Sequence, residues 1–227
     1  MKRIIKYIAL AILGTFNVGC QQIMDDLNSM APYKESFIDQ YWQITDNVDY
    51  SELVLCYEEL QLRVGINKEL VADIDGSTQE LVENHKRLSQ QYGDTSYNRR
   101  TTPGVDSAIA NTFKSIEIVS DADFDENHPA GSSLSDIVYW RLASWLPYIQ
   151  SGYNDDWFVY GAPTKKPLDD LEITDLTLLP CNDYFTFIFP TEPTLAPKHN
   201  FTITMTTVEG EEYAFTVEAD FNAPKQQ

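Results

Sequence analysis

Hydrophobic and polar positions alternate most regularly in the last third of the chain. Residues 201–206 alternate apolar side chains with threonine, and the same two-residue period returns over residues 213–221 after Glu209 and Gly210. A period of two is typical of a strand with one buried face, and a turn glycine between two such runs predicts a β-hairpin. Residues 184–189 carry apolar side chains on both faces, which predicts a central strand.

Further strand signals recur through the rest of the chain. Residues 53–56 form a continuous apolar run, which predicts a strand buried on both faces, whereas residues 60–66 alternate as a half-buried strand does. Two isoleucines separated by one glutamate predict a strand over about 112–120. Residues 171–173 and 176–179 are also strand-like.

Two segments have helical patterns. Residues 77–80 match a capping box, residues 78–92 place apolar side chains on one helical face, and Gly93 is a suitable residue to end that helix. Residues 133–146 predict either a second helix ended by Pro147 or a strand, because their apolar side chains suit both.

Short strands, one or two inserted helices and a terminal hairpin predict a mainly β fold. We expect an antiparallel β-sandwich, with an immunoglobulin-like arrangement as one form of it. The expected organisation is a signal peptide over residues 1–19, a lipidated tether leading into the domain over 20–45, the sandwich domain over 46–222 and a tail over 223–227.

The start of the chain carries the parts of a secretory signal. Three basic residues surround the beginning of an apolar-rich run over residues 4–16, and small residues precede Cys20. This run is too short to cross a bilayer core, which takes roughly twenty helical residues. A plain secreted protein with an incidental cysteine is the alternative to a lipidated one.

The segment resembles a bacterial lipoprotein signal, in which the thiol corresponding to Cys20 is acylated with fatty acids such as palmitate. Asn17 departs from the usual pattern, while Asp25 and Asp26 are similar to an acidic surface-export signal. With the loop over 120–134 and the hairpin over 202–221, the chain resembles outer-membrane lipoprotein families of Bacteroidales. The resemblance implies an anchored sandwich on the cell surface and no particular activity. Two or more acyl chains would hold such an anchor stably.

The charge of the chain narrows the classes of partner. The whole chain has a net charge of −19, and removing the basic signal leaves 13 of its 16 lysines and arginines against 35 aspartates and glutamates, a net charge of −22. Such a surface repels nucleic acid and anionic headgroups, so neither is an expected partner beyond the acyl anchor.

Two cysteines, Cys56 and Cys181, remain after the lipidation site. An exported protein can join them, and a disulfide that closes so long a loop would stabilise the fold by roughly 4–5 kcal/mol. Two separate buried thiols are the alternative, because both cysteines lie in apolar surroundings.

One loop carries candidate metal ligands. Asp121, Asp123 and Asp125 occupy alternate positions, as carboxylates do in the first half of a calcium-binding EF-hand loop. Glu126 and Ser132 stand where that loop needs glycine and a bidentate glutamate, so the segment is not an EF-hand. A structural calcium site or a solvated acidic turn are the two interpretations.

Large aromatic side chains cluster between Tyr139 and Tyr160. Trp140, Trp145 and Trp157 are the candidates for a binding face, because exposed tryptophans stack on sugar rings or anchor a protein partner. The alternative is that most of these rings fill the sandwich core.

The sequence contains few motifs for catalysis, cofactor binding or modification. The histidines form no zinc-protease motif, and no nucleophile elbow, phosphate loop or dinucleotide motif occurs; the three histidines are His85, His128 and His199. Ser107 lies in an Asp-Ser-Ala triplet that matches a short O-glycosylation pattern. No cofactor is implied.

Three functions follow in order of preference. The first is recognition of a glycan or protein at the cell surface by a non-enzymatic module, and the second is a structural or accessory subunit of an envelope complex. The third is a hydrolase, which would need a pocket with convergent carboxylates or a histidine beside Cys56.

Overall fold

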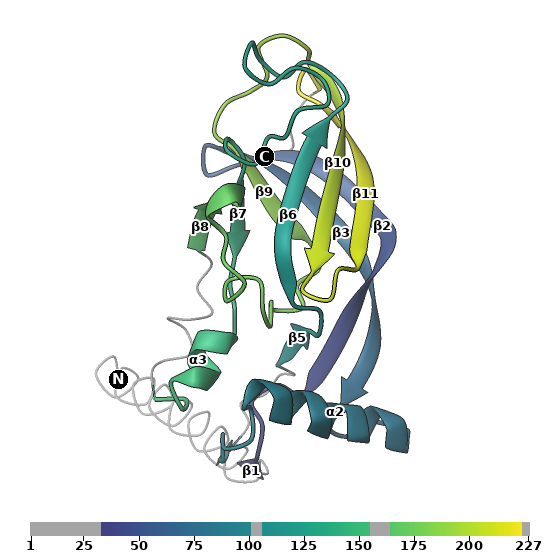
Figure 1. Ribbon diagram of the computed structural model, residues 1–227, viewed down its shortest axis with the longest axis vertical. Coiled ribbons are helices and arrows are strands. Elements are labelled where there is room, and N and C mark those ends of the chain that lie inside the picture. The colour runs from purple at the N-terminus through teal and green to yellow at the C-terminus, as the bar shows by residue number, and fades with distance from the viewer. Residues whose placement is uncertain (1–32, 101–105, 155–163, 224–227) are drawn as a thin grey trace, which may run out of the picture.

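The computed structural model describes residues 33–100, 106–154 and 164–223, and its fold is mainly β (Figure 1). The six-stranded sheet contains, in spatial order, β5 (Ser107–Ile109), β2 (Gln40–Cys56), β3 (Glu59–Asp73), β9 (Phe185–Phe189), β7 (Tyr139–Leu142) and β8 (Thr164–Pro167). The three-stranded sheet contains β11 (Glu212–Asp220), β10 (Lys198–Thr207) and β6 (Phe113–Ser120). The signal peptide, Cys20 and Trp157 lie outside the described residues.

Two short strands and three helical segments complete the fold. A two-stranded sheet joins β1 (Tyr33–Lys34) to β4 (Arg99–Arg100), and the helices are α2 (Gln79–Tyr92), α3 (Leu146–Gln150) and the 3-10 turn η1 (Leu168–Asp170). Figure 1 shows β1, α2 and α3 at one end of the molecule, which we call the base, and long loops at the other end, which we call the apex.

The terminal hairpin is confirmed. β10 and β11 pair in antiparallel register from Lys198 opposite Asp220 to Thr206 opposite Glu212. Gly210 has a φ of 94° in the connecting turn, a conformation that glycine adopts without steric cost. Burial alternates along β10 as the two-residue period predicts, because one face of this sheet meets the core and the other meets solvent.

The two large sheets share one hydrophobic core. Side chains from β3, β6, β9, β10 and β11 belong to the same buried cluster, and Figure 1 shows the three-stranded sheet lying over the six-stranded one. The prediction of a central strand at 184–189 is confirmed, since every residue of β9 is buried between β3 and β7. Phe187 is fully buried and stacks against Trp140 at 5.8 Å.

The six-stranded sheet is mixed rather than purely antiparallel. β2 pairs in parallel with β5, from Gln40 opposite Ser107 to Trp42 opposite Ile109, while the other pairs in this sheet are antiparallel. The same strand β2 begins at Gln40, within the segment predicted to be a tether and lead-in. Phe37 and Tyr41 are buried there, because this stretch packs against the base.

The helix predicted over 133–146 is wrong, and the alternative of a strand is confirmed for Tyr139–Leu142. A short helix follows at Leu146–Gln150, with Pro147 in its first turn instead of beyond its last. Proline is tolerated there because the first amide groups of a helix have no partner inside the helix. Sheet pairing with β9 decides the conformation of a segment whose side chains suit either state.

Two other strand predictions need correction. Residues 171–173 and 176–179 form turns and irregular backbone, although Leu176, Leu178 and Leu179 are buried in the core. Apolar residues here mark burial and not a strand. Residues 53–56 do lie in β2, but Leu55 is 41% exposed, so the strand is not buried on both faces.

Helix α2 agrees closely with its prediction. The N-cap is Thr78, whose hydroxyl accepts a hydrogen bond from the Leu81 amide, so the cap lies one residue later than the predicted capping box. Gly93 ends the helix in the left-handed conformation. The buried face carries His85, whose Nε2 lies 2.9 Å from the carbonyl of Ile38.

Candidate functional site

A groove of about 560 Å³ opens on the side of the molecule along β2 and β3. We call it the lateral groove. Its lining comes from four stretches of chain: Gln40, Trp42, Asp49 and Tyr50 of β2, Ile66, Asn67 and Lys68 of β3, Ser107 of β5, and Cys181 and Asp183 before β9. The volume lies within the range of small-ligand pockets, and the lining is more polar than is usual for such pockets.

Glycine at position 65 lets an aromatic ring lie flat on the sheet. Gly65 is opposite Tyr50 in the β2–β3 register, and a Cβ atom on Gly65 would lie 2.4 Å from Cε1 of the Tyr50 ring. The absence of that atom allows the ring to cover the strand. Tyr50 also makes an edge contact with Tyr184 at 6.5 Å, so a second tyrosine ring lies beside a residue that lines the groove.

The polar side chains of the groove divide into two groups. Gln40 donates to Asp73 at 2.8 Å, and Lys68 Nζ donates to the Asn182 carbonyl at 2.5 Å, which ties β3 to the segment before β9. By contrast, no hydrogen bond or ion pair within the described chain engages the side chains of Asp49 or Asp183. These carboxylates therefore remain available to a ligand.

One cysteine, Cys181, lines the groove. Cys181 and Cys56 are both free thiols, so the predicted disulfide is not formed and the alternative of two separate thiols holds. Burial raises the pKa of the Cys181 thiol, which favours the thiol over the nucleophilic thiolate. No histidine is among the residues that line the groove.

The candidate metal ligands lie in the apical loop, which we define as residues 121–136. Asp121 accepts hydrogen bonds from the backbone and side-chain amides of Asn200, and Asp123 accepts from the amide of Ala130 at 2.8 Å. Asp121 thus binds the start of β10, whereas Asp123 satisfies a donor of its own loop. Among the described residues no three metal-ligating side chains gather, so the proposed calcium ligands do not converge.

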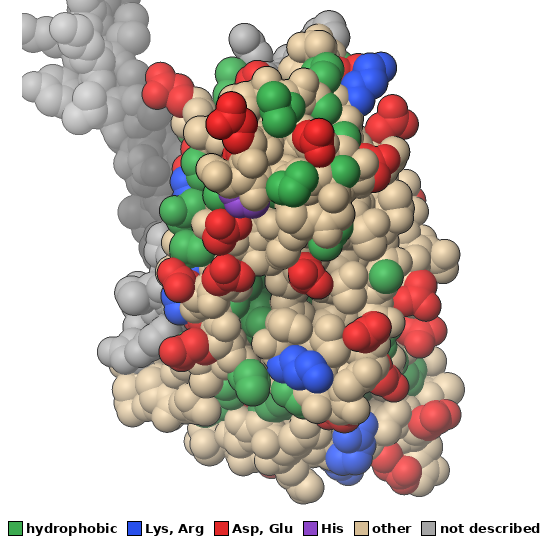
Figure 2. All heavy atoms as spheres, turned by 45° about the horizontal axis from the view of Figure 1, so that its top comes forward, with side chains coloured by type: hydrophobic (Ala, Val, Ile, Leu, Met, Phe, Trp, Pro, Cys, Tyr) green, Lys and Arg blue, Asp and Glu red, His purple; other side chains and the backbone are tan. Residues whose placement is uncertain are grey.

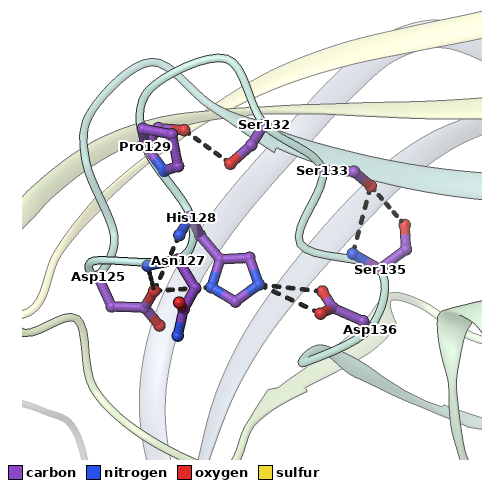
Figure 3. Close-up of polar contacts among 8 residues, drawn as sticks. All are labelled: Asp125, Asn127, His128, Pro129, Ser132, Ser133, Ser135 and Asp136. Atoms are coloured by element: carbon purple, nitrogen blue, oxygen red, sulfur yellow. Dashed lines mark hydrogen bonds and ion pairs between the residues drawn. The ribbon is translucent and has the colours of Figure 1, made fainter.

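Asp125 belongs to a clamp around His128 (Figure 3). His128 Nδ1 lies 2.8 Å from Asp125, and Nε2 lies 3.2 Å from both carboxylate oxygens of Asp136. Burial alone would lower the pKa of His128, but the bonds to the two aspartates raise it above the ordinary value. The clamp connects Asp125 and His128 to Asp136, the last residue of the loop. Sequence analysis gave His128 no role, because the loop closes only when folded.

A second histidine pairs with a serine at the end of β6. Ser120 Oγ lies 2.7 Å from His199 Nδ1, and His199 Nε2 donates to the Ala196 carbonyl at 2.7 Å, which leaves Nδ1 as the acceptor for the serine hydroxyl. Both residues are about 1% exposed. No substrate can reach so buried a pair, and the pair ties β6 to β10.

The tryptophans proposed as a binding face are buried where the structure describes them. Trp140 lies in the shared core, and Trp145 packs at the base with its Nε1 donating to the Ser107 carbonyl at 3.3 Å. The hypothesis of exposed rings is therefore wrong for both. Trp42 and Tyr50 are the aromatic residues of the groove, and sequence analysis did not select them.

The described surface is acidic, as the excess of aspartate and glutamate over lysine and arginine predicts. Figure 2 shows carboxylates spread over the apical side of the molecule with few lysines or arginines among them. None of the helices in the described ranges is both long and apolar enough to traverse a bilayer.

The chain was compared with protein-family models, curated proteins and solved structures. No protein-family model, no curated protein and no solved structure matches the chain significantly. The groove and the loops around it must be interpreted from their own chemistry.

Proposed function

We propose that the protein is a recognition module that binds a glycan in the lateral groove. The observation that carries this proposal is the combination of the Trp42 and Tyr50 rings with the unengaged carboxylates of Asp49 and Asp183 in one concave site. Aromatic rings bind the apolar faces of sugars, and free carboxylates accept hydrogen bonds from sugar hydroxyls. We also propose that the two sheets form a sandwich related to the immunoglobulin type.

The proposed place of action is the outside of the bacterial outer membrane. The acylated residue would be Cys20, and the described chain enters the fold at Tyr33, at the base (Figure 1). An anchor ahead of Tyr33 would hold the base toward the lipid, and the groove along β2 and β3 would face sideways. Glycans of the cell surface or its surroundings could then reach the groove.

A glycan array with purified domain tests the binding function. We expect wild type to bind one or more oligosaccharides and Tyr50→Ala to reduce that binding by about tenfold or more, since aromatic anchors carry much of the energy of such sites. Tyr57→Ala is the matched control, because Tyr57 is 90% exposed at the β2–β3 turn and does not line the groove.

Two outcomes would contradict the proposal. One is that the folded domain binds no glycan on a broad array. The other is that Tyr50→Ala and Tyr57→Ala reduce binding equally, which would separate the activity from the groove.

Metabolic labelling with a clickable fatty acid tests the anchor. We expect wild type to carry the label, Cys20→Ala to lose it, and protease added to intact cells to remove the wild-type protein. Label that persists in Cys20→Ala, or full protection from protease, would contradict a surface lipoprotein.

A further inference from the structure

The outer face of the six-stranded sheet carries a cross-strand row of basic side chains. Alternation on β3 places Leu62 and Val64 in the core and Arg63 on the opposite, outer face. Register pairs then extend the row from strand to strand. In order, the row is Glu52, Arg63, Thr186, Arg141 and Lys165.

This row differs from the rest of a strongly acidic chain. Three of its five residues are basic, whereas the chain has 35 acidic residues and 16 basic ones. Arg141 and Lys165 already have a partner, because both form ion pairs with Glu59. Arg63 is held more loosely, since its closest carboxylate oxygen, on Glu52, is 3.4 Å away.

Two buried donors lie beside this row, and the carboxylate of Glu59 lies close to one of them, the amide of Gln61. Among the described side chains, Arg63 Nε and Gln61 Nε2 are the buried nitrogen atoms without a hydrogen-bond partner. They are neighbours, because Arg63 donates to the amide oxygen of Gln61 at 3.4 Å. Gln61 is only 2% exposed. Buried donors normally have partners, so the unpaired Nε makes the Arg63 guanidinium, whose side chain is 23% exposed, the group of this row that an acceptor from outside the chain would complete.

The row is continuous with the lateral groove. The Arg63 guanidinium lies 5.0 Å from the centre of the Tyr184 ring, and Tyr184 contacts Tyr50, which lines the groove. A chain of sugars stacked on Tyr50 can therefore extend over Tyr184 toward Arg63.

We propose that the glycan is acidic and that one of its carboxylates binds the guanidinium of Arg63 on the outer face of the sheet. This inference rests on the proposed function and specifies its ligand as a uronic-acid oligosaccharide. The ligand carboxylate replaces Glu52 at the guanidinium. The exchange is favourable because 3.4 Å exceeds the ~2.8 Å of a good charge-assisted hydrogen bond, and arginine accepts a carboxylate in bidentate geometry.

Paired probes test the charge requirement. The panel contains oligomers of galacturonic, glucuronic, mannuronic and guluronic acid, each beside its methyl ester, which keeps the sugar ring and removes the charge. We expect wild type to bind at least one acid several-fold more tightly than its own ester in calorimetric titration. Arg63→Gln should weaken binding of that acid by roughly tenfold or more and leave binding of the ester unchanged.

A second variant acts in the opposite direction. Glu52→Gln removes the competing carboxylate, so we expect it to tighten binding of the acid and not of the ester. Lys198→Gln is the control, because Lys198 is an exposed lysine of β10 that belongs to the other sheet. Thermal unfolding of each variant confirms that the domain is folded.

The outcomes separate this inference from the proposed function. Equal affinity of wild type for every acid and its ester would overturn the acidic ligand while leaving glycan binding in place. Equal weakening of acid and ester by Arg63→Gln would have the same meaning. If neither probes nor array glycans bind, both proposals are wrong.

Discussion

Aspartate carboxylates occur in both the apical loop and the lateral groove, and they have different partners in the two places. Asp121, Asp123 and Asp125 accept hydrogen bonds from amides of their own loop or of the adjacent strand β10. Asp49 and Asp183 line the groove, and no hydrogen bond within the described chain engages their side chains. The aspartates of the apical loop thus stabilise that loop. Asp49 and Asp183, which lie far apart in the sequence, remain available to a ligand.

The two regions also differ in what supports them. The apical loop closes over Phe124, which is 1% exposed and contacts the rings of Phe189, Phe221 and His199. The residues that line the groove include no such buried ring, and most of them belong to strands. Variants in the loop should therefore change stability, and variants in the groove should change binding.

The largest expected effect is that of Phe124→Ala. Removing this buried ring should lower the free energy of unfolding by roughly 3–5 kcal/mol, because the transfer free energy is lost and a cavity remains. Urea denaturation measures the change, and the remaining folded protein should keep its affinity for the glycan. A loss below about 1 kcal/mol would mean that the polar contacts alone hold the loop.

Ser120→Ala should have the next largest effect. It leaves the buried Nδ1 of His199 without a donor, which costs roughly 1–3 kcal/mol of stability. Ser115→Ala, at an exposed position of the same strand, is the control. Equal stability of the two variants would show that the Ser120–His199 pair contributes nothing.

The sequence predicted the elements whose pattern is local. The β10–β11 hairpin, the buried strand β9 and helix α2 were predicted because alternation, apolar side chains on both faces of a strand and end-capping residues are each visible within a short window. Residues 176–179 were misassigned for the same reason, since a run of buried leucines in irregular backbone has the same local appearance as a strand.

The groove could not be predicted in this way. Its lining joins Trp42 and Tyr50 to Asp183, more than a hundred positions later, and the pairing of β2 with β3 and of β3 with β9 brings them together. The apical aspartates attracted attention because they are adjacent in sequence. Gly65 was a usable signal, since glycine inside a strand often marks a close approach of another group.

Gly65→Ala tests whether the groove depends on the Tyr50 ring. The added methyl group would overlap the ring, which must move, while the backbone needs no positive φ at this position. We expect glycan binding to weaken by about tenfold and stability to change by less than about 1 kcal/mol.

A double-mutant cycle supplies the control for this variant. Gly65→Ala should have no further effect on binding when Tyr50 is already alanine, because the only group it displaces is gone. An equal loss of binding in both backgrounds would mean that the methyl group acts through something other than the tyrosine.

The smallest expected effect is the pH dependence of the His128 clamp. The pKa of His128 is raised in the folded protein, so the clamp contributes fully below the ordinary histidine value of about 6.5 and is lost as pH rises through the raised value. The pKa of Asp125 is lowered, so its contribution is lost only as pH falls below the ordinary aspartate range. Wild type should therefore melt at a higher temperature than His128→Gln near pH 5.5, and the difference should shrink toward about pH 9. An NMR titration in which the His128 ring has a pKa below 6.5 would contradict the clamp.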